Sequence, residues 1–216
     1  MNRAGRAAEI LRILRATYPG VRCELDHDGP FQLLVATILS AQCTDVRVNL
    51  ITPALFRRYP DAPSLAAGAR EDIEELVRTT GFFRSKAKNI RTAAAELVAR
   101  HGGQVPRDLD ALTALPGVGR KTANVVLGNA YGIEAGVVVD THVGRLSRRL
   151  GLTKHADPVK VEQDLVKLVP REAWTEWSHL LIWHGRRRCF ARQPDCAACE
   201  LAAICPTAGK HGTRKR

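Results

Sequence analysis

The sequence predicts an all-α protein, and three observations favour this class. Apolar residues recur at helical spacing through most of the chain. Sustained alternation of apolar and polar residues between hairpin turns, which would indicate strands, does not occur. Glycine and proline separate the periodic segments, as at helix ends. The 216 residues suffice for one large domain or two modest ones, each with a hydrophobic core.

The predicted helices follow one another along almost the whole chain. The first 18 residues form an amphipathic helix, and their arginines interrupt any apolar core of a secretory signal. Residues 31–40 are apolar on nearly every side, which is typical of a helix at the centre of a domain. Gly81 and Gly102 are placed to end two of the helices that follow. The further helices are predicted at 44–59, with a stop or kink near Pro53, and at 70–80, 85–101, 108–114, 121–131, 141–150, 158–168 and 172–184.

The composition indicates a globular protein with a polyanionic partner. Hydrophobic residues make up 45% of the chain and charged residues 25%, which is ordinary for a globular domain. The 33 Lys and Arg residues outnumber the 22 Asp and Glu residues, so the formal net charge is +11. Such an excess points to nucleic acid or to an anionic membrane surface. No stretch approaches the ~20 apolar residues of a membrane span, so nucleic acid is favoured.

A tight turn between two predicted helices is the most informative local pattern. Residues 115–122 read Leu-Pro-Gly-Val-Gly-Arg-Lys-Thr, where proline and two glycines turn the backbone between a helix ending near 114 and one beginning at 121. The backbone amides of Gly117, Val118 and Gly119, with the positive end of the second helix, would form a cradle for a phosphate. A well-formed turn without any ligand is the simpler alternative.

Four cysteines near the C-terminus predict a metal centre. Cys189, Cys196, Cys199 and Cys205 are separated by six, two and five residues, in a segment too charged and loop-like to bury four free thiols. Thiolates in this number indicate zinc or an iron-sulfur cluster. Zinc sites typically use two close pairs, and only one such pair is present here. The remaining cysteines, Cys23 and Cys43, are expected to be packing residues.

Together these motifs resemble the endonuclease III family of helix-hairpin-helix DNA glycosylases. The resemblance rests on the hairpin at 115–122, on Val-Asp-Thr-His-Val at 139–143 and on the cysteine spacing, and it covers nearly the whole chain. It implies two helical domains with a cleft between them that holds the active site. The first domain would span 23–133 and contain the helix-hairpin-helix motif at about 108–131. The second would combine 1–22 with 134–216, and would carry a four-iron, four-sulfur cluster loop at 189–205.

The resemblance also implies the chemistry. Lys121 occupies the position of the family's nucleophile and Asp140 that of its catalytic carboxylate. The lysine would displace an oxidised pyrimidine from a flipped nucleotide, form a Schiff base with the sugar, and cleave 3′ of the abasic site by β-elimination. Lys121 would lie at the positive end of a helix, in a cleft from which water is partly excluded. Both features are expected to lower its pKa. Asp140 is also expected to cap the helix that follows it.

Four more residues are candidates for contact with DNA. Gln42 matches the family's glutamine that fills the gap left by an extruded base, and Phe82 matches its intercalating apolar residue. Phe82 is followed by basic residues at the start of the next helix: Arg84, Lys86 and Lys88. His142 could contact phosphate or orient Asp140, although a lone histidine is more often structural. Arg192 lies between the first two cysteines and is expected to bind phosphate. The three arginines at 145, 148 and 149 are expected to form a solvated face.

The expected partner is therefore damaged double-stranded DNA, bound by a monomer in a bacterial-type cytoplasm at the nucleoid. No membrane association and no obligate protein partner are expected. The alternatives are an adenine, pyrimidine-dimer or mismatch glycosylase on the same scaffold, or a non-catalytic DNA-binding module. The adenine-removing branch lacks the lysine and carries a further C-terminal domain, so Lys121 and the short segment after Cys205 oppose it.

Overall fold

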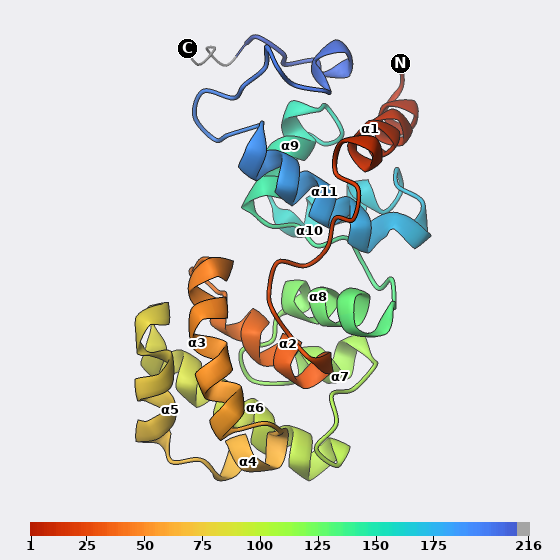
Figure 1. The fold of residues 1–216 in the computed structure, drawn as a ribbon. Helices are drawn as coiled ribbons and strands as arrows, with labels where there is room; N and C mark the ends of the chain where they lie inside the picture. The colour runs from red at the N-terminus through yellow and green to blue at the C-terminus, as the bar shows by residue number, and fades with distance from the viewer. Residues whose placement is uncertain (211–216) are drawn as a thin grey trace. The chain divides into compact units, whose positions relative to one another are not determined.

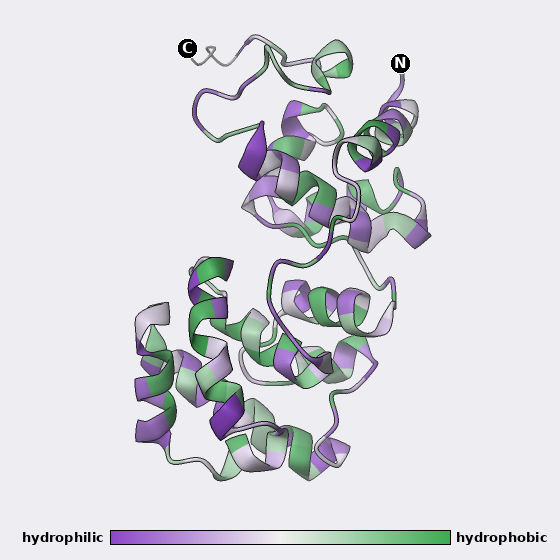
Figure 2. Cartoon of the chain, viewed as in Figure 1, coloured by the Kyte–Doolittle hydropathy of each residue, from purple (hydrophilic) through white to green (hydrophobic). Residues whose placement is uncertain are grey.

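The computed structural model describes residues 1–210, and its regular elements are all helical (Figure 1), which confirms the all-α prediction. Most of these elements are amphipathic, so apolar and polar residues share one helix (Figure 2). In residues 1–210 every helix is too short or too polar to cross a bilayer. The chain divides into two compact units, one formed by residues 23–135 and the other by residues 1–22 together with 136–216.

The unit formed by residues 23–135 packs around one central helix, α2. Its residues from Leu33 to Leu39 are all buried, in agreement with the all-round apolar pattern of this segment. Pro53 lies inside α3 without ending it, so of the predicted stop or kink the stop is not observed. The helices of this unit are α2 (Gly29–Leu39), α3 (Asp45–Arg58), α4 (Ala62–Ala67), α5 (Arg70–Val77), the 3-10 turn η1 (Arg78–Thr80), α6 (Phe83–His101), α7 (Leu109–Thr113) and α8 (Arg120–Tyr131).

The second unit joins the N-terminal helix to the C-terminal part of the chain. The buried face of α1, formed by Ala7, Ile10, Leu11 and Leu14, packs into a core whose largest side chain is the fully buried Trp177. The short apolar run at 137–139 is buried without regular secondary structure, and Val137 and Val139 pack into this core. The elements of the unit are α1 (Arg3–Thr17), α9 (Thr141–Arg149), α10 (Pro158–Leu165), η2 (Arg171–Ala173), α11 (Trp174–Arg187) and η3 (Ala202–Ile204).

Candidate functional site

The helix-hairpin-helix has the geometry that its sequence predicts. Asp108 begins α7 by accepting a hydrogen bond from the Ala111 N–H at 2.9 Å. After the end of α7 the backbone reverses through Gly117, whose φ of 77° is left-handed, and α8 begins at Arg120 with Gly119 as its N-cap. Gly119 has no side chain that could accept a hydrogen bond. The N-cap of α8 therefore provides no side-chain acceptor for the first backbone amides of the helix.

Gly117 is required by sterics as well as by its backbone angle. A Cβ atom at this position would lie 2.9 Å from the Cβ and Nδ2 atoms of Asn89, which supports the turn from α6. The α6 side chain therefore sets how closely the hairpin approaches the rest of the unit.

We expect Gly117→Ala to lower the free energy of unfolding by at least about 2 kcal/mol, because it adds left-handed strain to a clash with Asn89. Gly119→Ala is the matched control, since a Cβ there meets nothing within 4 Å, and it should cost no more than about 1 kcal/mol. Chemical denaturation of both variants measures the difference. Equal losses would contradict the steric argument.

The three hairpin residues expected to cradle a phosphate are not equivalent. Gly117 and Gly119 are exposed, whereas the Val118 side chain is buried in the core and its N–H already donates to the Leu115 carbonyl at 3.1 Å. The expectation that the Val118 amide is free for a ligand is therefore wrong. Val118 anchors the hairpin, because the residue between two glycines is the only one of the three that can bury a side chain.

Lys121 is the second residue of α8, so its side chain begins at the positive end of the helix, as predicted. It is exposed rather than enclosed. Within the unit formed by residues 23–135 the side chain projects outward, because it lies at the start of a helix that follows a surface hairpin, and its shielding by a cleft stays a prediction.

Asp140 is half-buried and caps α9, in the second unit. Its Oδ1 atom accepts a hydrogen bond from the Val143 N–H at 2.8 Å, which leaves the other carboxylate oxygen outside this bond. His142 packs against Gly185 of α11, and its Nδ1 atom lies 3.2 Å from Nη2 of Arg145. The capping role expected for Asp140 is thus present, and His142 has a packing role.

The two loop residues expected to probe DNA share an unusual backbone conformation. Gln42 and Phe82 have φ angles of 52° and 48°, a left-handed region that residues other than glycine rarely adopt. Both side chains are exposed, and Phe82 is 70% exposed. Phe83, the neighbour of Phe82, packs against the core. Strained backbone of this kind often occurs at functional sites, where the rest of the fold supports it.

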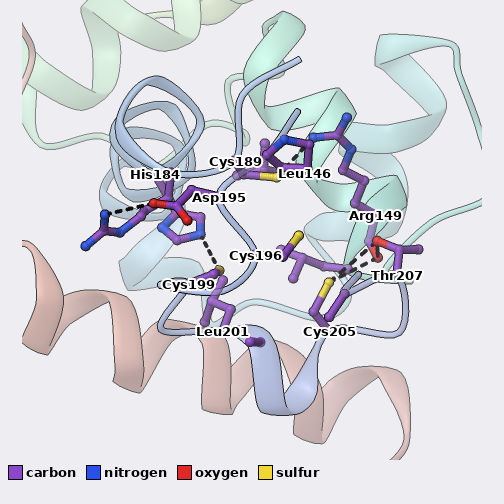
Figure 3. A pocket seen from close by; sticks show the side chains of 15 residues that line it. Leu146, Arg149, His184, Cys189, Asp195, Cys196, Cys199, Leu201, Cys205 and Thr207 are labelled. Atoms are coloured by element: carbon purple, nitrogen blue, oxygen red, sulfur yellow. Dashed lines mark hydrogen bonds and ion pairs between the residues drawn. The ribbon is translucent and has the colours of Figure 1, made fainter. Parts of the chain in front are cut away.

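The four C-terminal cysteines line one pocket of the second unit (Figure 3). Their sulfur atoms point into it from the loop after α11, beside Leu146 of α9 and Leu201. Burial is the main factor that raises the pKa of Cys199 to about 11, and neighbouring cysteines add to it. Thiolates crowded in this way need a compensating cation, so the donor set fits a metal centre.

Two side chains outside the cysteine loop donate toward the sulfur atoms. Nη1 of Arg149 lies 3.2 Å from the Cys189 Sγ atom, and Nε2 of His184 lies 3.4 Å from the Cys199 Sγ atom. Burial lowers the pKa of His184 to about 4, so the ring is neutral near neutral pH. If Nε2 carries its proton, Nδ1 can accept from the Tyr18 hydroxyl, which is 3.0 Å away. One tautomer then satisfies both contacts.

The prediction that the arginines of α9 form a solvated face is wrong for two of the three. Arg149 donates to the carbonyls of Phe190 and Ala191 at 2.7 and 2.9 Å, and Arg145 donates to the Cys189 carbonyl at 2.9 Å. Only Arg148 is exposed. Arg145 and Arg149 are four residues apart, so they lie on one face of α9. No sequence pattern shows which segment that face packs against. His184 carried no sequence signal either.

These contacts hold the loop that carries Arg192. The Arg149 guanidinium binds the two carbonyls immediately before it, and Arg192 itself is exposed. Gln193 follows with a φ of 49°. The loop therefore presents a cation from an anchored backbone.

Comparisons with known proteins agree with this geometry. The family model of the HhH-GPD superfamily base excision DNA repair protein matches residues 35–171. Endonuclease III of Synechocystis sp. is 60% identical over 203 residues, which cover 94% of this chain and 93% of the relative. Endonuclease III of Escherichia coli strain K12 is 44% identical over 208 residues, or 95% and 96% of the two chains.

Solved structures give the same result. A non-covalent endonuclease III–DNA complex matches with a TM-score of 0.92 and 42% identity, covering 97% of this chain and 98% of the other. A trapped endonuclease III–DNA covalent intermediate matches with a TM-score of 0.92 and 42% identity, covering 97% and 99%. The chain belongs to the HhH-GPD superfamily of base excision DNA repair proteins and, within it, to the endonuclease III family.

Proposed function

We propose that the protein is a bifunctional DNA glycosylase and abasic-site lyase that removes oxidised pyrimidines from duplex DNA. The observation that carries this proposal is Lys121, an exposed amine in the first turn of α8, directly after the glycine hairpin. An amine placed beside a phosphate-binding turn can reach a deoxyribose whose flanking phosphate the turn holds. The net charge of +11 suits a polyanionic substrate.

The reaction begins when the nucleotide is flipped out of the duplex. The Lys121 nitrogen attacks C1′, the bond from C1′ to the base breaks, and the base leaves after taking up a proton. The bonded nitrogen loses one of its two protons, and the ring oxygen O4′ takes up a proton as the sugar opens, which leaves a protonated imine between Lys121 and C1′. This acidifies the C2′ proton, whose removal expels the 3′ phosphate by β-elimination. Water then hydrolyses the imine and restores the amine.

Within the proposal, Asp140 stabilises positive charge on the sugar and assists the proton transfers. Gly117 and Gly119 bind a phosphate through backbone amides, Gln42 fills the gap left by the flipped nucleotide, and Phe82 enters the base stack. Arg192 binds a further phosphate. His142 contributes by packing beside Asp140, which fits its contacts with Gly185 and Arg145.

The same proposal assigns a four-iron, four-sulfur cluster to the pocket, with Cys189, Cys196, Cys199 and Cys205 as its ligands. Such a cluster would bind four thiolates and hold the surrounding loop in one shape. The single close cysteine pair argues against zinc. We place the protein in the cytoplasm with the chromosomal DNA.

The proposal is tested by borohydride reduction in the presence of duplex DNA that contains an abasic site. A lysine Schiff base is reduced to a stable covalent adduct, which gel electrophoresis separates from free protein. A panel of duplexes with oxidised pyrimidines then reads the glycosylase step. A protein that binds these duplexes but is never trapped would be a passive DNA-binding module, and the enzymatic proposal would be wrong.

Asp140→Asn should separate the carboxylate's chemistry from its capping role. Asparagine keeps the acceptor for the Val143 N–H, so we expect unchanged stability and a rate of trapping that falls by roughly 10²- to 10⁴-fold without vanishing. Asp140→Ala should lose about 1 kcal/mol of stability as well. Single-turnover trapping and thermal unfolding measure the two effects.

Asp157 supplies the control, because it caps α10 of the same unit through the Lys160 N–H at 3.0 Å. Asp157→Asn should leave both trapping and stability at the parent's values. Full activity in Asp140→Asn would show that the charge at this position is not needed.

A further inference from the structure

Lys86 is a buried lysine in the unit formed by residues 23–135. Only 5% of its surface is exposed, and its ammonium group donates to the Thr80 carbonyl at 2.7 Å. Burial lowers the pKa of Lys86, while the nearby Cys43 thiol acts in the opposite direction. The sequence groups it with Arg84 and Lys88 as part of a basic helix start, but those two side chains are exposed and Lys86 is not. Phosphate contact is therefore not its role.

The two polar groups of Lys86 bond to the two sides of one short turn. Its side chain binds the Thr80 carbonyl, which precedes the turn, and its backbone N–H donates to the Phe82 carbonyl at 3.1 Å. Gly81 lies between these bonds with φ 70° and ψ 149°, and Phe82 follows with φ 48° and ψ 29°. Thr80 is the last residue of η1, so the ammonium also meets the negative end of that turn.

The turn needs such support because its conformation is strained. A left-handed residue other than glycine costs free energy and persists only where surrounding contacts hold it. The Phe82 side chain is 70% exposed, so its own packing holds it weakly, and it makes no side-chain capping bond at the start of α6. The bonds from the Lys86 ammonium to the Thr80 carbonyl and from its backbone N–H to the Phe82 carbonyl span this turn, and together they are called the Lys86 clamp.

We propose that Lys86 is a positioning residue, whose buried ammonium fixes the Gly81–Phe82 turn so that Phe82 is presented to the DNA base stack. The inference rests on the proposed function, in which Phe82 enters the duplex as a nucleotide flips out. It adds a residue that touches neither DNA nor the reacting atoms. Cys43, which acts on the same ammonium, directly follows Gln42, so the clamp lies close to both strained loops.

The test compares single-turnover borohydride trapping, at saturating enzyme, on an abasic site in duplex DNA and in a single strand. A single strand needs no wedge, because its nucleotides are already free of a stack. Lys86→Met keeps an unbranched apolar side chain that reaches as far as Cε and removes the donor. We expect it to lower the duplex rate roughly 10- to 100-fold, while the single-strand rate stays within about twofold of the parent's. Lys88→Met, which removes the same charge from the exposed face of α6, should keep the parent's ratio of the two rates.

Two further variants keep the test decisive. Gly81→Ala strains the same turn through its φ of 70° and without a clash, because a Cβ there meets nothing within 4 Å. It should reproduce the loss of rate on duplex DNA alone, even if Lys86→Met folds poorly. Combined with Phe82→Ala, Lys86→Met should add no further loss, since both changes remove one wedge. A parent-like ratio, an equal fall on both substrates, or additive losses would overturn the positioning role. A parent protein that is trapped on neither substrate would instead overturn the proposed function.

Discussion

Lys121→Ala is expected to abolish the covalent adduct with abasic-site DNA and to lower base release by roughly 10⁴-fold or more. The size of the effect follows from the proposed chemistry, in which one nitrogen forms the bond to C1′ and then activates the C2′ proton. Without it, the glycosylase and lyase steps both lose their nucleophile. Trapping and release of labelled base from a duplex with one oxidised pyrimidine measure the two steps separately.

Lys121→Arg is the matched control for charge. It keeps a cation in the first turn of α8, so its affinity for DNA and the salt dependence of binding should stay near the parent's. A guanidinium is not a nucleophile near neutral pH, so no adduct should form. An adduct in either variant would place the Schiff base on another amine and would refute the assignment of Lys121.

On the proposed assignment of a four-iron, four-sulfur cluster, Cys199→Ala is expected to remove iron and inorganic sulfide and to loosen the C-terminal loop. Cys199 is a half-buried member of the four-cysteine pocket, and its loss would leave the proposed cluster without one ligand and His184 without its sulfur partner. The free energy of unfolding should fall by more than about 2 kcal/mol, which lowers the melting temperature by roughly 4–8 °C in a chain of this size. Metal and sulfide analysis and thermal unfolding of the purified holoprotein measure the change.

Cys23→Ala provides the comparison, since Cys23 is a half-buried packing residue of the other unit. It should keep full iron content and lose little stability. Cleavage by a protease should increase between residues 189 and 205 in Cys199→Ala alone. Zinc in place of iron in the parent would refute the proposed cluster while leaving the cysteine site intact.

These predictions depend to different degrees on sequence and structure. The hairpin, the helix that begins after it and the position of Lys121 in its first turn follow from proline, glycine and helical periodicity, all of which act over a few residues. The cap formed by Asp140 is local in the same sense, because its acceptor and the Val143 N–H are three residues apart. Cysteine spacing likewise indicates metal ligation without knowledge of the fold.

Contacts between distant segments required the structure. Arg149 and Cys189 are 40 residues apart, and His184 meets both Tyr18 and Cys199. Lys86 appears in the sequence as one of several surface cations, yet it is buried beneath a turn. Val118 appears as a phosphate donor, yet its amide is already bonded.

The sequence by itself determined most of the helices, the hairpin and the metal-binding residue types, because each depends on chemistry within one or two helical turns, whereas the short helix α4 was not predicted. Only the tertiary structure decided which polar groups support the cysteine loop and which lysine holds the strained turn. Periodicity shows which face of a helix is apolar, whereas the partner of a buried polar group is set by the packing of segments far apart in the chain.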